Sequence, residues 1–89
     1  MKARATKRFW SCFGQLPVEV QNRARSAFER WIENPGHPGL RFRPIHGTRP
    51  IYSVRIAGRW RALGLRDGDT MIWFWIGSHA DYDRMISRL

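Results

Sequence analysis

Cysteine is almost absent from this 89-residue chain, which has a single thiol at Cys12. One cysteine cannot form a disulfide within the chain or build a thiolate metal cluster, so we expect a reducing compartment. Long apolar runs are also missing, since no stretch reaches the roughly 18 apolar residues of a membrane-spanning helix. The basic start, residues 1–8, is followed only by a short aromatic stretch that is too brief and polar for the hydrophobic region of a signal peptide. These absences predict a cytoplasmic protein.

Acidic residues are scarce as well. Seven Asp and Glu stand against sixteen Lys and Arg, which gives a formal net charge of +9. A charge of this size on so short a chain attracts polyanions, such as nucleic acid or an acidic protein partner. Hydrophobic residues still make up 43% of the chain, with five tryptophans, so a packed core is expected rather than disorder. The length predicts one domain over residues 1–89.

The first half predicts two amphipathic helices. Thr6 is a suitable N-cap for a short helix that runs to about residue 13. The aromatic residues of this helix are expected to face the core: Phe9, Trp10 and Phe13. After a break at Gly14-Gln15, Pro17 begins a longer helix that ends at residues 34–36. Its apolar residues recur every three or four positions: Val20, Ala24, Ala27, Phe28, Trp31 and Ile32. The short break predicts a helical hairpin.

The second half has the two-residue period of strands. An edge strand ending in proline is predicted over residues 40–44, and three more strands over residues 51–56, 60–66 and 71–76. The last of these is apolar throughout, so it should be covered on both faces. Residues 1–6 have no strand pattern and are expected to form a basic arm. The predicted fold is α+β, with an N-terminal helical hairpin packed on a small antiparallel β-meander and a short C-terminal helix.

Turn signals predict the register of the meander. A three-residue turn over residues 57–59 places Arg55 opposite Arg61, on one face of the sheet. A two-residue turn at Asp67-Gly68 would set small residues of one strand opposite large ones of the next. The expected pairs are Ala62 with Trp73 and Gly64 with Met71.

The last segment carries residues suited to phosphate chemistry. In Ser78-His79-Ala80-Asp81, a serine is followed three residues later by an acid, which is the pattern of a capping box. His79 should therefore begin a helix, where free backbone N–H groups favour a phosphate and disfavour imidazolium. Tyr82 lies on the same side of that helix, three residues later. A phosphate held by Arg61 and Arg55, with an imidazole and a phenol nearby, suits attack of an RNA 2′-hydroxyl on its own phosphodiester. Such chemistry needs no metal.

Each of these residues also has a plain structural interpretation. A histidine at a helix start is common, Tyr82 can belong to the core, and strand arginines are often only solvated. His37 and His46 lie in loops rich in proline and glycine, and the three histidines lack the spacing of a zinc site, so no cofactor is expected. Three further arginines are interpreted as an electrostatic platform for an RNA backbone: Arg41, Arg43 and Arg49.

Three motifs resemble the RelE/ParE toxin superfamily, the toxins of type II toxin–antitoxin modules. They are Tyr52-Ser53-Val54-Arg55-Ile56, Trp60-Arg61-Ala62-Leu63 and the C-terminal stretch 76–83, within a similarity over roughly residues 7 to 89. The resemblance implies an mRNA endoribonuclease, free or ribosome-associated, that an acidic antitoxin silences. The family usually opens with a strand that residues 1–6 lack, and one hypothesis is that an antitoxin strand fills that edge.

The resemblance also implies roles for individual residues. Arg61 stands at the position of the arginine that stabilises the phosphate in the RelE branch, and Arg55 at that of a basic residue that binds RNA. His79 matches the basic residue that transfers a proton or stabilises the leaving group, and Tyr82 is the candidate for an assisting tyrosine. Members of the ParE branch instead inhibit DNA gyrase. Two alternatives therefore stay open: a gyrase inhibitor that acts by binding, and a catalytically silent relative that binds only RNA or antitoxin.

Overall fold

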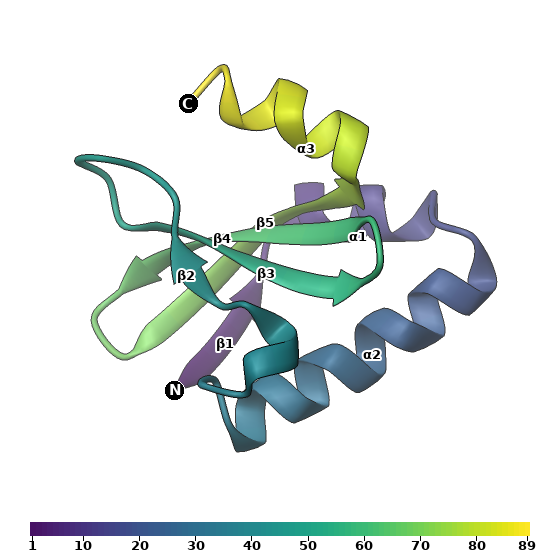
Figure 1. Ribbon diagram of the computed structural model, residues 1–89, viewed down its shortest axis with the longest axis horizontal. Coiled ribbons are helices and arrows are strands. Elements are labelled where there is room, and N and C mark those ends of the chain that lie inside the picture. Colours follow the sequence, from purple (N-terminus) through teal and green to yellow (C-terminus); the bar gives the residue numbers. More distant parts are fainter.

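The computed structural model describes residues 1–89, the whole chain, as one five-stranded sheet with three α-helices (Figure 1). The strands are β1 (Lys2–Ala5), β2 (Arg43–Pro44), β3 (Ile51–Ala57), β4 (Trp60–Asp67) and β5 (Thr70–Ser78). The helices are α1 (Lys7–Gly14), α2 (Val18–Glu33) and α3 (His79–Ile86), with a 3-10 turn η1 at Pro38–Leu40. The α+β class, the helical hairpin and the short C-terminal helix are confirmed. None of the three helices has the length and apolar character needed to cross a bilayer.

The N-terminus differs most from the prediction. Lys2–Ala5 form β1, which pairs in parallel with β5 and lies at one edge of the sheet order β1-β5-β4-β3-β2. The backbone carries this pairing, since Lys2 N donates to Asp69 O and Thr6 N donates to Trp73 O. Most side chains of this edge strand are exposed, so they show no apolar alternation. The expected basic arm is therefore wrong, and so is the hypothesis of an antitoxin strand there, because the chain's own first strand occupies that edge of β5.

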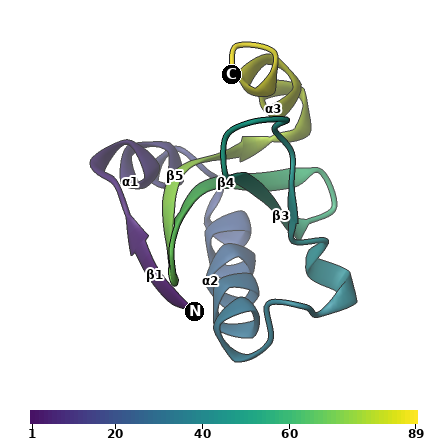
Figure 2. The same ribbon diagram turned by 90° about the vertical axis from the view of Figure 1, so that its left-hand side faces the viewer.

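The sheet separates two cores (Figure 2). Helices α1 and α2 cover one face, and α3 packs on the other, where the smaller core consists of Ile51, Leu63, Trp75 and Tyr82. Two residues that were expected in the first core, Trp10 and Ile32, are each 57% exposed. Each follows a buried residue directly, and one step along a helix turns a side chain by about 100°. The spacing therefore correctly predicted burial for Phe9 and Trp31, and the predicted burial of Trp10 and Ile32 is wrong.

The predicted edge strand at residues 40–44 is shorter than expected. Only Arg43–Pro44 pair with β3, because Leu40 ends the 3-10 turn and Arg41 adopts a left-handed conformation with φ of 47°. A residue in that conformation cannot continue a strand, so pairing begins after it. Arg43 lies opposite Ser53, and opposed residues of an antiparallel pair point to the same face.

The register between β4 and β5 differs from the predicted one. Gly64 lies opposite Trp73 instead of Met71, since Gly68 and Asp69 form the turn and Gly68 takes a positive φ of 60°. A bulge also shifts the pairing between Leu63 and Gly64. The physical argument for small residues still holds, because a β-carbon on Gly64 would lie 2.7 Å from the Trp73 ring.

Candidate active site

One face of the sheet carries arginines near the turn between β3 and β4. Arg55 lies opposite Arg61, as predicted, so both side chains share a face. Arg43, opposite Ser53, points to the same face because Ser53 is two residues before Arg55 in β3. Like charges directly opposite each other destabilise a sheet. The two ion pairs of the structure both lie within α3, so no carboxylate neutralises this group.

Arg61 is the electrostatic centre of the group. Burial, followed by the charge of Arg55, lowers the pKa of Arg61 below the usual arginine value. Arg41 and Arg43 act in the same direction, and Tyr82 opposes them. These residues, predicted from separate segments, therefore lie close enough to act on one guanidinium. Because arginine stays protonated in proteins, their positive potential adds at one place and favours a bound anion.

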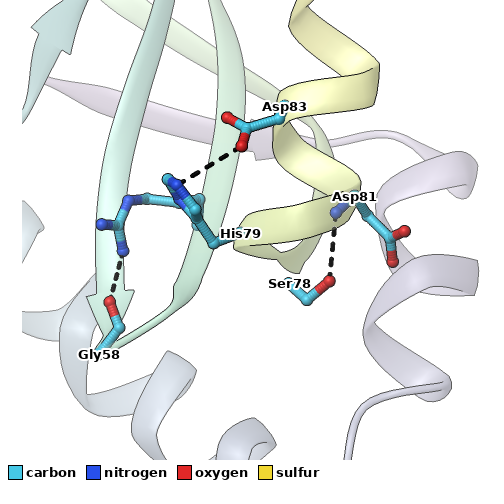
Figure 3. Close-up of polar contacts among 6 residues, drawn as sticks. Gly58, Ser78, His79, Asp81 and Asp83 are labelled. Atoms are coloured by element: carbon cyan, nitrogen blue, oxygen red, sulfur yellow. Dashed lines mark hydrogen bonds and ion pairs between the residues drawn. The ribbon is translucent and has the colours of Figure 1, made fainter.

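The turn between β3 and β4 holds the Arg61 side chain in place, and the dashed line to the labelled Gly58 in Figure 3 marks one of its hydrogen bonds. Its Nη1 donates to the carbonyl oxygens of Gly58, at 2.7 Å, and of Trp60, at 3.1 Å. Gly58 has a positive φ of 49°, a conformation that glycine adopts without steric cost. A guanidinium has five N–H donors. The donors on Nε and Nη2 have no protein partner and can bind a phosphate oxygen.

The start of α3 places His79 as the sequence predicted. Ser78 is the N-cap, and its Oγ accepts a hydrogen bond of 3.3 Å from the backbone N–H of Asp81 (Figure 3). His79 is the first residue of the helix. The capping box is only half formed, because the carboxylate of Asp81 pairs with Arg84 instead of with the N-cap N–H.

His79 has two neighbours on α3. Its ring stacks on that of Tyr82, with centroids 5.8 Å apart and an angle of 23° between the planes. Its Nε2 lies 3.6 Å from a carboxylate oxygen of Asp83, one turn later (Figure 3). The carboxylate attracts the imidazolium, which is opposite to the effect of the helix N-terminus. Asp83 was missed in the sequence, although its i,i+4 spacing from His79 was a usable signal.

Tyr82 links the two parts of the site from within the core. It is only 8% exposed and packs on Trp75 at 6.5 Å, as the plain structural interpretation of this residue expected. The Trp75 ring in turn covers Gly77, where a β-carbon would lie 2.6 Å from Cζ2 of the indole. Gly77 is the residue opposite Arg61. Trp75 and Gly77 were not predicted as site residues, and the glycine inside an apolar strand was the signal for a close approach.

The remaining predicted residues lie elsewhere. His37 Nδ1 accepts a hydrogen bond from Gly39 N, and His46 Nδ1 accepts bonds from the backbone of its own loop, including Arg49 N. Both are loop residues, as expected, and Arg49 does not join the group around Arg61. No group of three or more His, Cys, Asp or Glu side chains is placed to hold a metal ion.

The sequence and the fold of this chain are both similar to those of known toxins. The profile of the ParE-like toxin domain matches residues 18–84. The RelB-RelE antitoxin-toxin complex from Methanococcus jannaschii contains a similar chain, with TM-score 0.73, 20% identity and coverage of 91% of this chain and 96% of that one. The E. coli DinJ-YafQ toxin-antitoxin complex gives TM-score 0.72, 10% identity and coverage of 90% and 93%.

A third similar structure is the YoeB/ParE toxin from Agrobacterium tumefaciens, with TM-score 0.67, 15% identity and coverage of 89% and 99%. At these identities the likeness is one of fold. The sequence itself matches no curated protein.

Proposed function

This chain belongs to the ParE-like toxin domain family, within the RelE/ParE superfamily, and we propose that it is a toxin that cleaves messenger RNA by attack of a 2′-hydroxyl. The observation that carries the proposal is the unneutralised arginine group centred on Arg61, together with the imidazole of His79. His79 begins α3 two residues after Gly77, the residue opposite Arg61, and has a carboxylate partner. A polyanion fits such a group. Cleavage by the RNA's own hydroxyl requires only that the protein stabilise charge and move protons.

In the proposed reaction the 2′-oxygen attacks phosphorus, and the bond from phosphorus to the 5′-oxygen breaks. The products are a 2′,3′-cyclic phosphate and a 5′-hydroxyl. The free N–H groups of Arg61 bind the non-bridging oxygens, whose negative charge grows in the transition state. The ring of His79, whose Nε2 lies 3.6 Å from a carboxylate oxygen of Asp83, donates a proton to the departing 5′-oxygen, and the 2′-hydroxyl proton passes to solvent.

The roles of the other residues follow from their positions. Arg55, Arg41 and Arg43 bind the RNA backbone around the scissile phosphate, since all three act on Arg61. The buried ring of Tyr82 orients the imidazole that stacks on it. The proposed substrate is translated mRNA, and the toxin itself is either ribosome-associated or free. A cognate acidic antitoxin is the proposed silencing partner, because the net charge of +9 is complementary to an acidic chain.

A gyrase inhibitor of the ParE kind is the second candidate, because the matching family profile is the ParE-like one. That function requires binding to a protein target and no cleavage of RNA. Induction of such a protein in a bacterium would activate the DNA-damage response and leave mRNA intact.

The test compares induction of the wild-type chain with induction of Arg61→Ala and His79→Ala. In extracts that contain ribosomes, in extracts that lack them, or in both, the wild-type chain should cleave mRNA. Mapping of the mRNA ends should then show 2′,3′-cyclic phosphates. Loss of the arginine should slow cleavage by about 10²–10³-fold, and loss of the histidine by about 10²–10⁴-fold. Arg88→Ala, which removes an exposed arginine that makes only backbone hydrogen bonds, is the matched control. If both site variants fold and remain as toxic as the wild type, the catalytic assignment fails.

A further inference from the structure

A second basic surface lies on the other side of the β3–β4 turn. It is a groove of about 300 Å³ between α2 and the end of β3. Its lining consists of Asn22, Arg23, Ser26 and Arg30 from the helix and Ile56 and Ala57 from the strand. No acidic residue lines it, and the guanidinium groups of its two exposed arginines make no hydrogen bond or ion pair within the chain.

Helix geometry presents these polar residues as one row. Arg23, Ser26 and Arg30 are spaced by three and four residues, so they lie on one side of α2. The two arginines are seven residues apart, which separates their backbones by about 10.5 Å along the helix. Two guanidinium groups with a hydroxyl between them form a row of donors suited to successive phosphates of one strand.

The groove adjoins the candidate active site through the turn. Ala57 lines the groove, and the next residue, Gly58, provides the carbonyl that holds Arg61. Figure 1 shows this turn between α2 and α3, and Arg59 is exposed within it. An RNA strand that passes Arg61 can therefore cross the turn and reach α2 without leaving positively charged surface.

We propose that this groove is a second contact site for the backbone of single-stranded RNA, beside the site of cleavage. The inference rests on the proposed function, because it assumes that RNA is bound at Arg61. RNA fits better than an acidic protein, since protein interfaces have an apolar centre with aromatic residues. The exposed apolar residues Trp10 and Ile32 line a different, apolar groove between β1, α1 and α2.

The test measures binding of a 2′-O-methyl oligouridine of about 20 nucleotides, a length that spans several phosphate contacts. This probe keeps every phosphate and lacks the 2′-hydroxyl nucleophile, so the proposed reaction cannot consume it. Fluorescence anisotropy gives the association constant from about 0.05 to 0.4 M salt, and each contact to single-stranded nucleic acid contributes about 0.7 to the slope of log K against log salt. Arg23→Ala/Arg30→Ala should therefore reduce the slope by about 1.4, so a tenfold rise in salt should weaken binding by the variant about 25-fold less than binding by the wild type.

The matched control is Lys2→Ala/Arg4→Ala, which removes two positive charges from β1 at the far edge of the sheet. This pair should leave the slope at the wild-type value. Alanine is the best helix former, so the α2 variant should keep the wild-type helix content by circular dichroism.

The outcomes separate this inference from the proposed function. A wild-type chain that neither binds the oligonucleotide nor cuts RNA overturns both. A wild-type chain that cuts RNA, with an α2 variant whose slope matches the control, overturns only the second contact site. Poly-L-glutamate is the parallel probe: if the α2 variant loses affinity for it and keeps the wild-type RNA slope, the groove binds an acidic protein and the proposal is wrong.

Discussion

Replacing Gly77 by alanine would test how tightly the candidate site is packed. A β-carbon at this position would lie 2.6 Å from Cζ2 of Trp75 and 3.0 Å from its Cη2. Carbon atoms in contact prefer about 3.5–4.0 Å, so the indole would have to move by about 1 Å. Trp75 is only 7% exposed and packs with Ile51, Leu63 and Tyr82, so a shift of the ring would displace its neighbours in this second core.

The expected cost of Gly77→Ala is that of overpacking, about 1–3 kcal/mol. For a chain of this length, each kcal/mol lowers the midpoint of thermal unfolding by about 4–8 °C. A loss of about 2 kcal/mol would thus lower Tm by roughly 8–16 °C. Thermal and urea unfolding followed by circular dichroism would measure both quantities.

Gly14→Ala is the matched control, because no heavy atom lies within 4 Å of the β-carbon it would add at the end of α1. This change should leave stability unchanged or raise it by about 0.4–1 kcal/mol. In a Trp75→Leu background, Gly77→Ala should cost less than about 0.5 kcal/mol, since the clashing ring is gone. A Gly77→Ala variant as stable as the wild type, or one with the same cost in both backgrounds, would refute the reasoning.

Two further predictions concern charge and capping. Arg55→Thr removes the like charge opposite Arg61, so it should stabilise the fold by about 0.2–1 kcal/mol in denaturant titrations at low salt while weakening RNA binding. That gain should shrink at about 1 M salt, and a gain that is equal at both salt concentrations would exclude charge repulsion as its cause. Thr6→Ala removes the hydrogen bond of 3.1 Å from Phe9 N to the N-cap of α1 and should cost about 1 kcal/mol, whereas Thr6→Ser should keep most of the stability. Equal unfolding midpoints for the two variants at Thr6 would contradict the capping role.

Local sequence patterns were sufficient to predict the features that depend on nearby residues. The three-to-four-residue period of apolar side chains predicted α1 and α2, and Ser78 predicted the start of α3 with His79 as its first residue. The pairing of Arg55 with Arg61 was also predicted, although the expected three-residue turn is wrong. Gly58 and Arg59 form a two-residue turn, and an irregularity between Arg55 and Ala57 restores the pair. Such features follow from local geometry, which a sequence pattern records directly.

Features that depend on pairing between distant segments of the chain could not be predicted in this way. β1 was missed because an edge strand is held by backbone hydrogen bonds, which leave no pattern in its side chains. The predicted register of β4 and β5 was wrong because Asp67-Gly68-Asp69 allows a turn at Asp67-Gly68 or at Gly68-Asp69. The second turn forms, and in that register Trp73 packs against Gly64.

The candidate site shows the same division. Arg61, Arg55 and His79 were chosen from the sequence with the correct local placement. Their surroundings were not predictable. Arg41 comes close to Arg61 because its own backbone is left-handed, and Arg43 does so because β2 pairs with β3. The packing of Trp75 over Gly77 and the groove on α2 likewise join segments far apart in the chain. The sequence thus determined which chemical groups are present and on which elements they lie, while folding decided their distances, because those depend on contacts that no local pattern encodes.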